Sequence, residues 1–312
     1  MQQIIKVTGL SKNFNKIQAV NQLSFSVNQG DVYGFLGQNG AGKSTTIRML
    51  LTLITPSAGH IDMFGLDLNK HRKEILRQVG AVIEKPDVYK YLTAIENLKL
   101  FMKISGGAML GRPQLLEMLE LVGLQERADG AVKTFSQGMK QRLGVAIALI
   151  HDPQLVILDE PTNGLDPQGI ADIRNLILRL SRTMSKTVLV SSHLLSEIEL
   201  IANRLLIIDK GAKMVEGYAK ELFDPSNTII EVETLDNAKS TTAIQQSDWK
   251  QHLQPSRNGA IVLKMDKNQI PSFNEALTAM HVPVVSLVPR LSLEDYFLQV
   301  TTRNQHVEAF KD

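Results

Sequence analysis

Apolar and polar positions in the first two thirds of the chain alternate between two spacings, one typical of strands and one typical of helices. Short uninterrupted apolar runs, such as residues 32–36 and 155–158, predict strands buried in a parallel sheet. Between such runs apolar side chains recur every three or four positions, as at Leu143, Ile147 and Ile150, and predict helices. This alternation indicates an α/β sheet with helical crossovers. Further strands are predicted at residues 4–7, 23–27, 79–83, 187–190, 205–208 and 213–215.

Capping residues mark where several helices begin. Thr93 and Glu96 form an S/T-x-x-E capping box before a helix that reaches about residue 102. Pro113, Ser136 and Pro167 each stand at the start of a further helix. Two more helices are predicted, one after Gly42 with Ile47, Leu50, Leu51 and Ile54 at helical spacing, and one at residues 194–201.

The composition changes after residue 224, where the regular alternation ends. We therefore expect a large α/β domain at residues 1–220 and a small α+β accessory domain at residues 225–312. A second capping box, Ser292-x-x-Asp295, predicts a last helix. The other elements predicted here are strands at 229–232, 261–264 and 284–288, a polar stretch after the first of them, and a helix at about 270–280.

The composition is that of an ordinary globular chain and excludes several kinds of chemistry. The 312 residues are 43% hydrophobic and 21% charged, with a formal net charge of +2, which does not indicate nucleic-acid binding. The absence of cysteine excludes disulfides, thiolate metal sites and a catalytic thiol. The chain shows neither a secretory signal nor an apolar run of the roughly 20 residues that span a bilayer. We expect a protein that is cytoplasmic or attached to a partner that is not.

A phosphate-binding pattern follows the strand at residues 32–36. The glycines of G-x-x-x-x-G-K-[ST] let backbone amides surround a phosphate, while the lysine reaches the β- and γ-phosphates and the hydroxyl ligates Mg²⁺. A glycine-rich surface loop is the plain alternative, but the strand–loop–helix order favours a site for ATP and Mg²⁺. The loop comprises Gly37, Gln38, Asn39, Gly40, Ala41, Gly42, Lys43 and Ser44, and we assign the adjacent Thr45 to the same site.

Two consecutive carboxylates end the strand at residues 155–158. Ligands of open α/β sheets bind beyond the carboxyl ends of the strands, so Asp159 and Glu160 are placed near the phosphate loop. Neighbouring side chains of an extended segment point apart, which leaves Asp159 to hold Mg²⁺ through a water and Glu160 to take a proton from the attacking water. A surface-exposed strand end is the alternative, and the complete phosphate loop makes it less attractive.

Two shorter elements are ambiguous by themselves. Ser136 and Gly138 stand at a helix N-terminus, which binds anions but also describes any capped helix. His193 follows a strand, where a polar surface histidine is equally ordinary.

The order of all these elements resembles the nucleotide-binding subunit of ABC transporters across residues 1–220. The resemblance rests on the phosphate loop, the segments 136–139, 158–161 and 163–166, and His193. It implies a P-loop NTPase fold in which a mixed sheet carries a helical subdomain. It also implies that Phe14 stacks on adenine, although Phe14 could instead be a core residue. By the same resemblance Ser136 and Gly138 contact the γ-phosphate of ATP held by another subunit, Asp166 lies at the subunit junction, and His193 contacts the γ-phosphate.

Two positions depart from the general family pattern. Glu84 stands where the family usually has a glutamine that reaches Mg²⁺ and the attacking water; a carboxylate can ligate Mg²⁺ but cannot donate a hydrogen bond while ionised. The segment 135–139 reads Phe-Ser-Gln-Gly-Met instead of Leu-Ser-Gly-Gly-Gln. Both departures, and the tail at residues 291–297, are similar to a subgroup that exports antibiotics and bacteriocins, including bacitracin-resistance and lantibiotic-immunity ATPases.

The resemblance implies an ATP-hydrolysing subunit of a transporter. Two copies, most simply a homodimer, would enclose ATP head to tail and pass their motion to separate membrane permease subunits, which would hold them at the cytoplasmic face of the cell membrane. Residues 85–97 form the expected docking segment, with Val88, Tyr89 and Tyr91 facing the permease or packing internally.

Two alternative functions remain: a soluble ABC ATPase that acts as a mechanical switch on nucleic acid or the ribosome, and an inactive interaction module. The near-neutral charge and the intact Lys43 and Glu160 argue against them.

Overall fold

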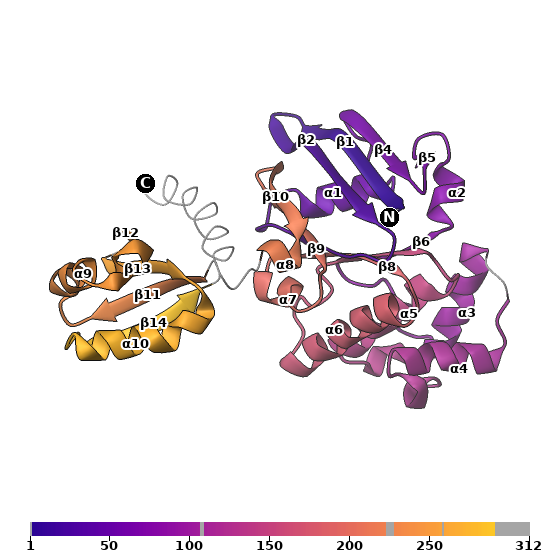
Figure 1. The fold of residues 1–312 in the computed structure, drawn as a ribbon. Helices are drawn as coiled ribbons and strands as arrows, with labels where there is room; N and C mark the ends of the chain where they lie inside the picture. Colours follow the sequence, from indigo (N-terminus) through magenta and orange to yellow (C-terminus); the bar gives the residue numbers. More distant parts are fainter. Residues whose placement is uncertain (1, 107–108, 223–227, 258, 291–312) are drawn as a thin grey trace, which may run out of the picture. The chain divides into compact units, whose positions relative to one another are not determined.

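The computed structural model describes residues 2–106, 109–222, 228–257 and 259–290. The chain divides into two units, with the division between Tyr218 and Ala219, and each unit is described by itself (Figure 1). The tail at residues 291–297 and the last helix predicted to start at Ser292 lie outside the described residues. In the described ranges no helix is both long and apolar enough to cross a bilayer.

A six-stranded sheet lies at the centre of the first unit, in the order β10-β9-β3-β8-β7-β6. Five of its strands run parallel, and β10 closes one edge as an antiparallel hairpin with β9. Every residue of β3, β7 and β8 is buried, as expected for strands covered on both faces. The strands are β3 (Val32–Leu36), β6 (Val79–Ile83), β7 (Leu155–Asp159), β8 (Thr187–Ser192), β9 (Arg204–Asp209) and β10 (Ala212–Tyr218).

A second, antiparallel sheet has the order β2-β1-β4-β5 (Figure 1). Its strands β1 (Gln3–Phe14) and β2 (Ile17–Asn28) extend well beyond the short runs predicted from sequence. Strands β4 (Ala58–Met63) and β5 (Leu66–Asp67) were not predicted. The first three residues of β4 are exposed, so β4 offers only Ile61 and Met63 as a buried apolar signal.

Helices cover both faces of the six-stranded sheet. Helix α1 (Lys43–Leu50) packs its apolar side chains into the core between the two sheets. It ends earlier than the periodicity predicted, because Leu51 is its C-cap and Thr52 adopts a positive φ of 57°, so Ile54 lies outside it. The other helices of this unit are α2 (Arg72–Leu76), α3 (Ala94–Ser105), α4 (Arg112–Leu121), α5 (Gln137–Leu149), α6 (Pro167–Arg182) and α7 (Leu195–Glu199), with 3-10 turns at Gln125–Arg127 and Val132–Thr134.

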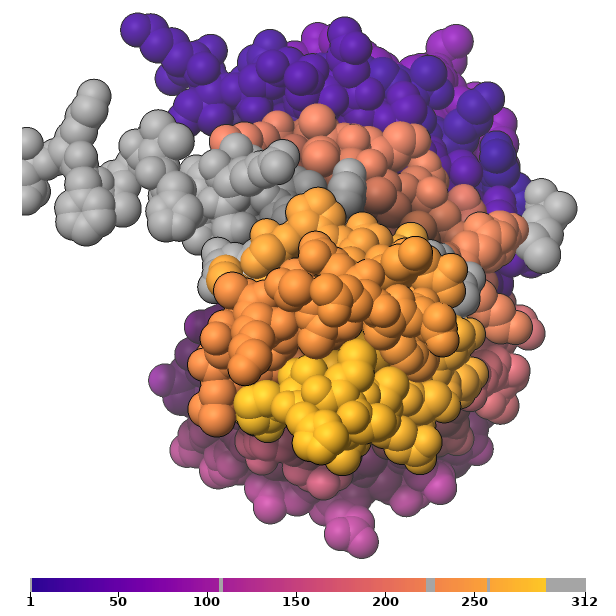
Figure 2. All heavy atoms as spheres, turned by 60° about the vertical axis from the view of Figure 1, so that its left-hand side comes forward, coloured from indigo at the N-terminus to yellow at the C-terminus, as the bar shows by residue number. Residues whose placement is uncertain are grey.

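The second unit is a four-stranded antiparallel sheet in the order β12-β13-β11-β14, packed against helices. Its residues form a closely packed body, drawn in orange to yellow in Figure 2. Helix α9 and strand β12 occupy the stretch predicted only as polar, because among the apolar residues of α9 only Ile244 is fully buried. The elements are α8 (Ala219–Leu222), β11 (Thr228–Thr234), α9 (Asn237–Gln245), β12 (Leu253–Arg257), β13 (Ala260–Met265), α10 (Ile270–Ala279) and β14 (Val284–Arg290), with 3-10 turns at Asp248–His252 and Lys267–Gln269.

Candidate active site

The carboxyl ends of four neighbouring strands bring the predicted site residues to one edge of the sheet. The ladder pairs Ile83 of β6 with Asp159 of β7, and Asp159 with Ser191 of β8. It also pairs Ser192 of β8 with Leu36, the last residue of β3. The residues that follow these strands are Glu84, Glu160, His193 and Gly37, and they therefore emerge side by side.

The phosphate loop joins β3 to α1 with a backbone that requires glycine. Gly42 has a φ of 104°, and a Cβ atom at this position would lie 2.5 Å from the carbonyl oxygen of Ala19. A Cβ atom at Gly37 would lie 2.7 Å from the carbonyl oxygen of Ile208. Gly42 is also the N-cap of α1, so the positive end of this helix points toward the loop.

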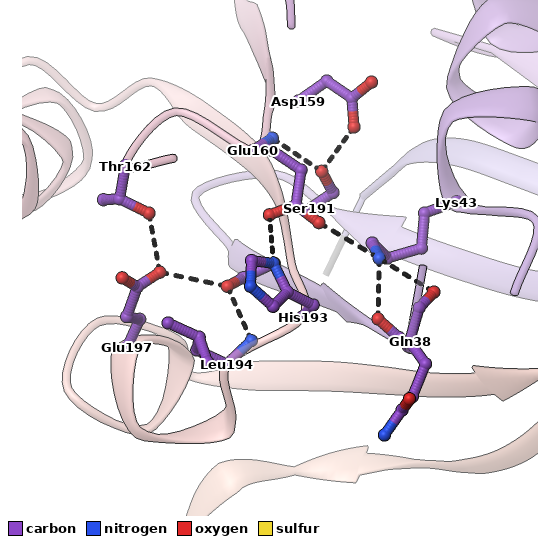
Figure 3. A network of polar contacts seen from close by, with 11 residues as sticks. Gln38, Lys43, Asp159, Glu160, Thr162, Ser191, His193, Leu194 and Glu197 are labelled. Atoms are coloured by element: carbon purple, nitrogen blue, oxygen red, sulfur yellow. Dashed lines mark hydrogen bonds and ion pairs between the residues drawn. The ribbon is translucent and has the colours of Figure 1, made fainter. Parts of the chain in front are cut away.

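Lys43 is buried inside this loop. Its Nζ donates hydrogen bonds to the carbonyl oxygens of Gly37 at 2.6 Å and Gln38 at 3.2 Å, and lies 3.0 Å from Oε1 of Glu160 (Figure 3). An ammonium held by carbonyl and carboxylate oxygens can exchange them for phosphate oxygens, which are acceptors of the same kind.

Glu160 lies between two basic side chains. Its Oε2 is 2.8 Å from Nδ1 of His193, while its Oε1 faces Lys43. Glu160 adopts a φ of 48°, an uncommon backbone conformation for glutamate, directly where β7 ends. Such outliers occur at functional sites, where the surrounding structure holds them in place. The structure thus brings together three predicted site residues that lie far apart in sequence.

Asp159 is fully buried beside Glu160. Its Oδ1 accepts a hydrogen bond from Ser191 Oγ at 2.5 Å, and the same Ser191 Oγ accepts one from the Glu160 backbone N–H at 2.9 Å (Figure 3). Burial raises the pKa of the Asp159 carboxyl, and the charges of Glu160 and Glu84 act in the same direction, against the hydrogen bonds from Ser191 and Ser44.

The surroundings of Asp159 fit a hard divalent cation. Its Oδ2 is buried without a hydrogen-bond partner, and the nearby Ser44 hydroxyl acts to lower the pKa of this carboxyl. Oxygen ligands from one or two protein groups, completed by phosphates and water, are what Mg²⁺ takes in nucleotide sites. Within the described ranges no group of three or more His, Asp or Glu side chains could hold a metal by itself, so nucleotide oxygens would have to complete the shell.

Glu84 follows β6 with a φ of 55° and a side chain that is 59% exposed. Its Oε1 lies 2.6 Å from Nη2 of Arg48, which belongs to the helix that begins at the phosphate loop. Both residues line an open cavity of about 860 Å³ together with Glu160 and Gln141. The cavity places Glu84 at the edge of the site, and its carboxylate is paired with Arg48.

Ser136 and Asp166 cap two helices near this cavity. Ser136 Oγ accepts a hydrogen bond from Met139 N at the start of α5, and Asp166 Oδ1 accepts one from Gly169 N at the start of α6. Gln137 Nε2 donates to the carbonyl oxygen of Asn163 at 3.3 Å and thereby links the two segments. Ser136, Gln137 and Asp166 are exposed, so all three are open to a partner molecule.

Phe14 is the last residue of β1 and precedes all the other site residues in the chain. The residue is 44% exposed, so it is not the core residue that the sequence left as an alternative. Lys12 Nζ lies 4.9 Å from the ring centroid, so one face of the ring is engaged with a cation. An exposed aromatic ring can stack on a base, and its assignment to adenine stays a prediction.

Comparison with known proteins identifies the family. An ABC transporter family model matches residues 20–163. Over 301 residues the chain is 42% identical to the bacitracin transport ATP-binding protein BcrA of Bacillus licheniformis, covering 96% of this chain and 98% of that protein. The chain belongs to the ABC transporter ATP-binding family. It is also 39% identical over 213 residues to the lantibiotic transport ATP-binding protein SrtF of Streptococcus pyogenes, covering 68% of this chain and 90% of that one.

Solved structures agree with this membership. A dimeric ATP-binding cassette in a post-hydrolysis state, bound to ADP and Pi, matches with a TM-score of 0.62 and 25% identity, covering 69% of this chain and 98% of that one. The P-loop NTPase fold predicted from sequence is therefore confirmed, and so is the family. This chain is an ATP-binding and ATP-hydrolysing subunit of an ABC transporter, similar to ATPases of antibiotic and bacteriocin transport.

Sequence reasoning missed the hydroxyl and carboxyl groups that support the site of this ABC ATPase. Ser191 connects Asp159 to the Glu160 backbone, and Glu197 accepts hydrogen bonds from Thr162 and Ser192 (Figure 3). Polar residues at strand ends carry no periodic pattern that would reveal them. The one usable signal was the clustering of Ser191 and Ser192 directly before His193.

Proposed function

We propose that two copies of this ABC ATPase close head to tail on two ATP molecules, each bound by the phosphate loop of one copy and by Ser136 and Gly138 of the other. The observation that carries the proposal is the position of Glu160, whose carboxylate lies between Lys43 and His193 at the edge of the sheet. The exposed start of α5 supports the second half of the site, because the unsatisfied N–H groups of a first helical turn bind anions.

The residues have separable roles in this proposal. The phosphate loop from Gly37 to Thr45 binds the phosphates, and Phe14 stacks on adenine. Ser44 and Asp159 hold Mg²⁺, which supplies positive charge against the phosphate oxygens. Glu160 accepts the proton of the attacking water, and His193, whose Nδ1 is bonded to Glu160, turns its other ring nitrogen to the γ-phosphate.

The segment at residues 85–97 supports docking on a membrane permease. Tyr91 is 89% exposed and Tyr89 is 54% exposed, so neither ring is packed into the interior of its unit. The fully buried Asn97 fixes this segment, because its amide bonds both the N–H and the carbonyl of Tyr89. Aromatic rings presented on a fixed backbone are typical of interface hot spots.

The similarity to bacitracin and lantibiotic transport proteins supports export of an antibiotic, peptide or similar compound. The chain would then work at the cytoplasmic face of the cell membrane through its permease subunits. Cells that carry this chain with a permease encoded beside it should resist bacitracin or a lantibiotic better than cells with the Lys43→Ala variant. Equal resistance to both compounds in the two strains would contradict this substrate class and leave ATP hydrolysis untouched.

A mixed dimer tests the head-to-tail arrangement. In a dimer of one Lys43→Ala copy and one Ser136→Arg copy, both lesions fall on one composite site and the other site stays whole. We expect the mixture to hydrolyse ATP faster than either variant alone, whereas each homodimer stays inactive. A mixture no more active than its parts, beside a wild-type mixture of normal activity, would contradict the arrangement.

A further inference from the structure

Glu197 connects the two segments that carry the candidate catalytic pair. It lies on α7, and its Oε2 accepts hydrogen bonds from Thr162 Oγ1 at 2.7 Å and from Ser192 Oγ at 3.0 Å (Figure 3). Thr162 follows Glu160 by two residues, and Ser192 directly precedes His193. A single carboxylate oxygen therefore joins the segment after β7 to the last residue of β8.

Glu160 and His193 both lie just beyond the strand ladders. The last paired residues are Asp159 of β7 and Ser192 of β8, so the backbone of Glu160 and of His193 lies beyond the sheet pairing. Backbone hydrogen bonds of the sheet therefore do not set the 2.8 Å distance between Glu160 Oε2 and His193 Nδ1. The positive φ of Glu160 also requires support from its surroundings.

Side-chain hydroxyls provide this support. Ser192 Oγ donates to Glu197 and accepts a hydrogen bond from Leu194 N at 3.0 Å, so it fixes the turn that contains His193. Bonds to an ionised carboxylate are stronger than bonds between neutral groups. Glu197 thus restrains both sides of the Glu160–His193 contact.

Helix α7 is held by buried apolar side chains and also borders a cavity. Ile198 is fully buried, and its Cγ2 lies 2.2 Å from where a Cβ atom at Gly34 would stand, so β3 needs glycine there. A mainly apolar cavity of about 330 Å³ borders the helix elsewhere, lined by Thr162, Glu197 and side chains of α6. The bonds from Glu197 to the two hydroxyls therefore fix a short helix that has empty space beside it.

We propose that Glu197 is a positioning residue, which holds Glu160 and His193 at the separation that hydrolysis requires. The inference rests on the proposed roles of that pair. It assigns Glu197 no contact with ATP: its carboxylate bonds the hydroxyls of Thr162 and Ser192. Loss of this carboxylate should slow turnover and leave nucleotide binding unchanged, because small misplacements of reacting groups affect the chemical step.

The test compares three Glu197 variants for kcat, KM for ATP, nucleotide affinity and Tm. Glu197→Ala removes both bonds and should lower kcat by roughly 10- to 100-fold, with KM and nucleotide affinity within about twofold of wild type. Glu197→Gln keeps an acceptor oxygen and should retain much of kcat. Glu197→Asp is one methylene shorter, cannot reach both hydroxyls, and should resemble Glu197→Ala. Ser196→Ala on the same helix and Glu117→Gln on α4 are the controls, expected to match wild type.

A double-mutant cycle separates positioning from general stability. Thr162→Val removes the hydroxyl at similar volume and should slow wild type, but add little in the Glu197→Ala background. Unchanged kcat in Glu197→Ala, or a loss of kcat that follows a loss of Tm and nucleotide affinity, would overturn the proposal.

Glu160→Gln is measured beside these variants. If it stays active, the proposed role of Glu160 fails; if it is inactive and the Glu197 variants are not, only the positioning role fails.

Discussion

The ammonium of Lys43 lies 3.0 Å from Oε1 of Glu160, so the cation expected to bind phosphate is paired with the carboxylate expected to accept a proton. While this pair stands, Glu160 Oε1 and the phosphate oxygens compete for the same ammonium. Phosphate oxygens that take over Lys43 would replace the carboxylate as its partner. ATP binding would then free Glu160 on the side that faces the phosphate loop, and His193 would remain bonded on the other side.

Replacement of this carboxylate tests its role directly. Glu160→Gln should lower steady-state ATP turnover by about 10²–10⁴-fold, the usual loss when a general base is removed. ATP binding should persist, because Lys43 keeps its bonds to the carbonyl oxygens of Gly37 and Gln38 and can still exchange them. Turnover assays and equilibrium nucleotide binding are the two measurements, and gel filtration with ATP should show a trapped dimer. Hydrolysis near the wild-type rate would contradict the assignment of Glu160.

Asp159 should show a conflict between stability and activity. Its pKa is raised by burial, so its ionised form is disfavoured in the folded state and costs stability at pH values above the raised pKa. Asp159→Asn removes the charge, and its amide oxygen can still accept the Ser191 bond. We expect the nucleotide-free protein to gain roughly 1 kcal/mol or more in unfolding free energy, while Mg²⁺-dependent hydrolysis is lost.

Thermal or urea unfolding at neutral pH, without nucleotide, checks the gain in stability at residue 159. The difference between Asp159→Asn and wild type should shrink as the pH falls through the raised pKa, because wild-type Asp159 then becomes neutral as well. If the variant is less stable than wild type at neutral pH, the folded protein stabilises the ionised Asp159 carboxylate without a metal ion, and the prediction is wrong.

The sequence predicts those features of the fold and the site that depend on residues close together in the chain, and misses those that depend on residues far apart. The phosphate loop and the strand before Asp159 are local patterns, and both were predicted at their observed positions. The Arg48–Glu84 pair joins residues 36 apart, and no local pattern predicts that α1 and the end of β6 meet. The link from Glu197 to Thr162 was missed for the same reason, because these residues are 35 apart and become neighbours only when β7 and β8 pair.

Gly144 of α5 provides a test of the packing behind the Glu84 segment. A Cβ atom at Gly144 would lie 2.4 Å from Cβ of Pro86, so Gly144→Ala must displace the helix or the segment. Alanine favours a helix over glycine, but the overlap should outweigh this and lower the unfolding free energy by about 1–3 kcal/mol. Urea unfolding measures it. Pro86→Gly in the same chain should restore part of the loss, and a Gly144→Ala protein as stable as wild type would contradict the close contact.

Glu84 offers a sharp test of how the site binds Mg²⁺ and water. If its carboxylate leaves Arg48 to reach Mg²⁺ or the attacking water, Glu84→Ala should cut hydrolysis sharply and raise the Mg²⁺ requirement. Glu84→Gln should keep much of the activity, because an amide oxygen can ligate the metal and the amide can position water. Phosphoryl transfer depends on placed charge, so the effect should appear in rate before nucleotide affinity.

Arg48 distinguishes a metal-facing Glu84 from a mere surface ion pair. The two side chains are 43% and 59% exposed, and such pairs contribute at most about 1 kcal/mol to stability, so Arg48→Gln should fold normally. It leaves the Glu84 charge uncompensated at the edge of the site, which should weaken ATP binding through repulsion of the phosphates, and Glu84→Gln in the same chain should restore it. The measurement is the ATPase rate against Mg²⁺ and ATP concentration for wild type and each variant. A residue that reaches the metal or the water cannot lose its carboxylate without changing the rate. Superimposable curves for wild type, Glu84→Ala and Glu84→Gln would therefore show that Glu84 is only a surface partner of Arg48.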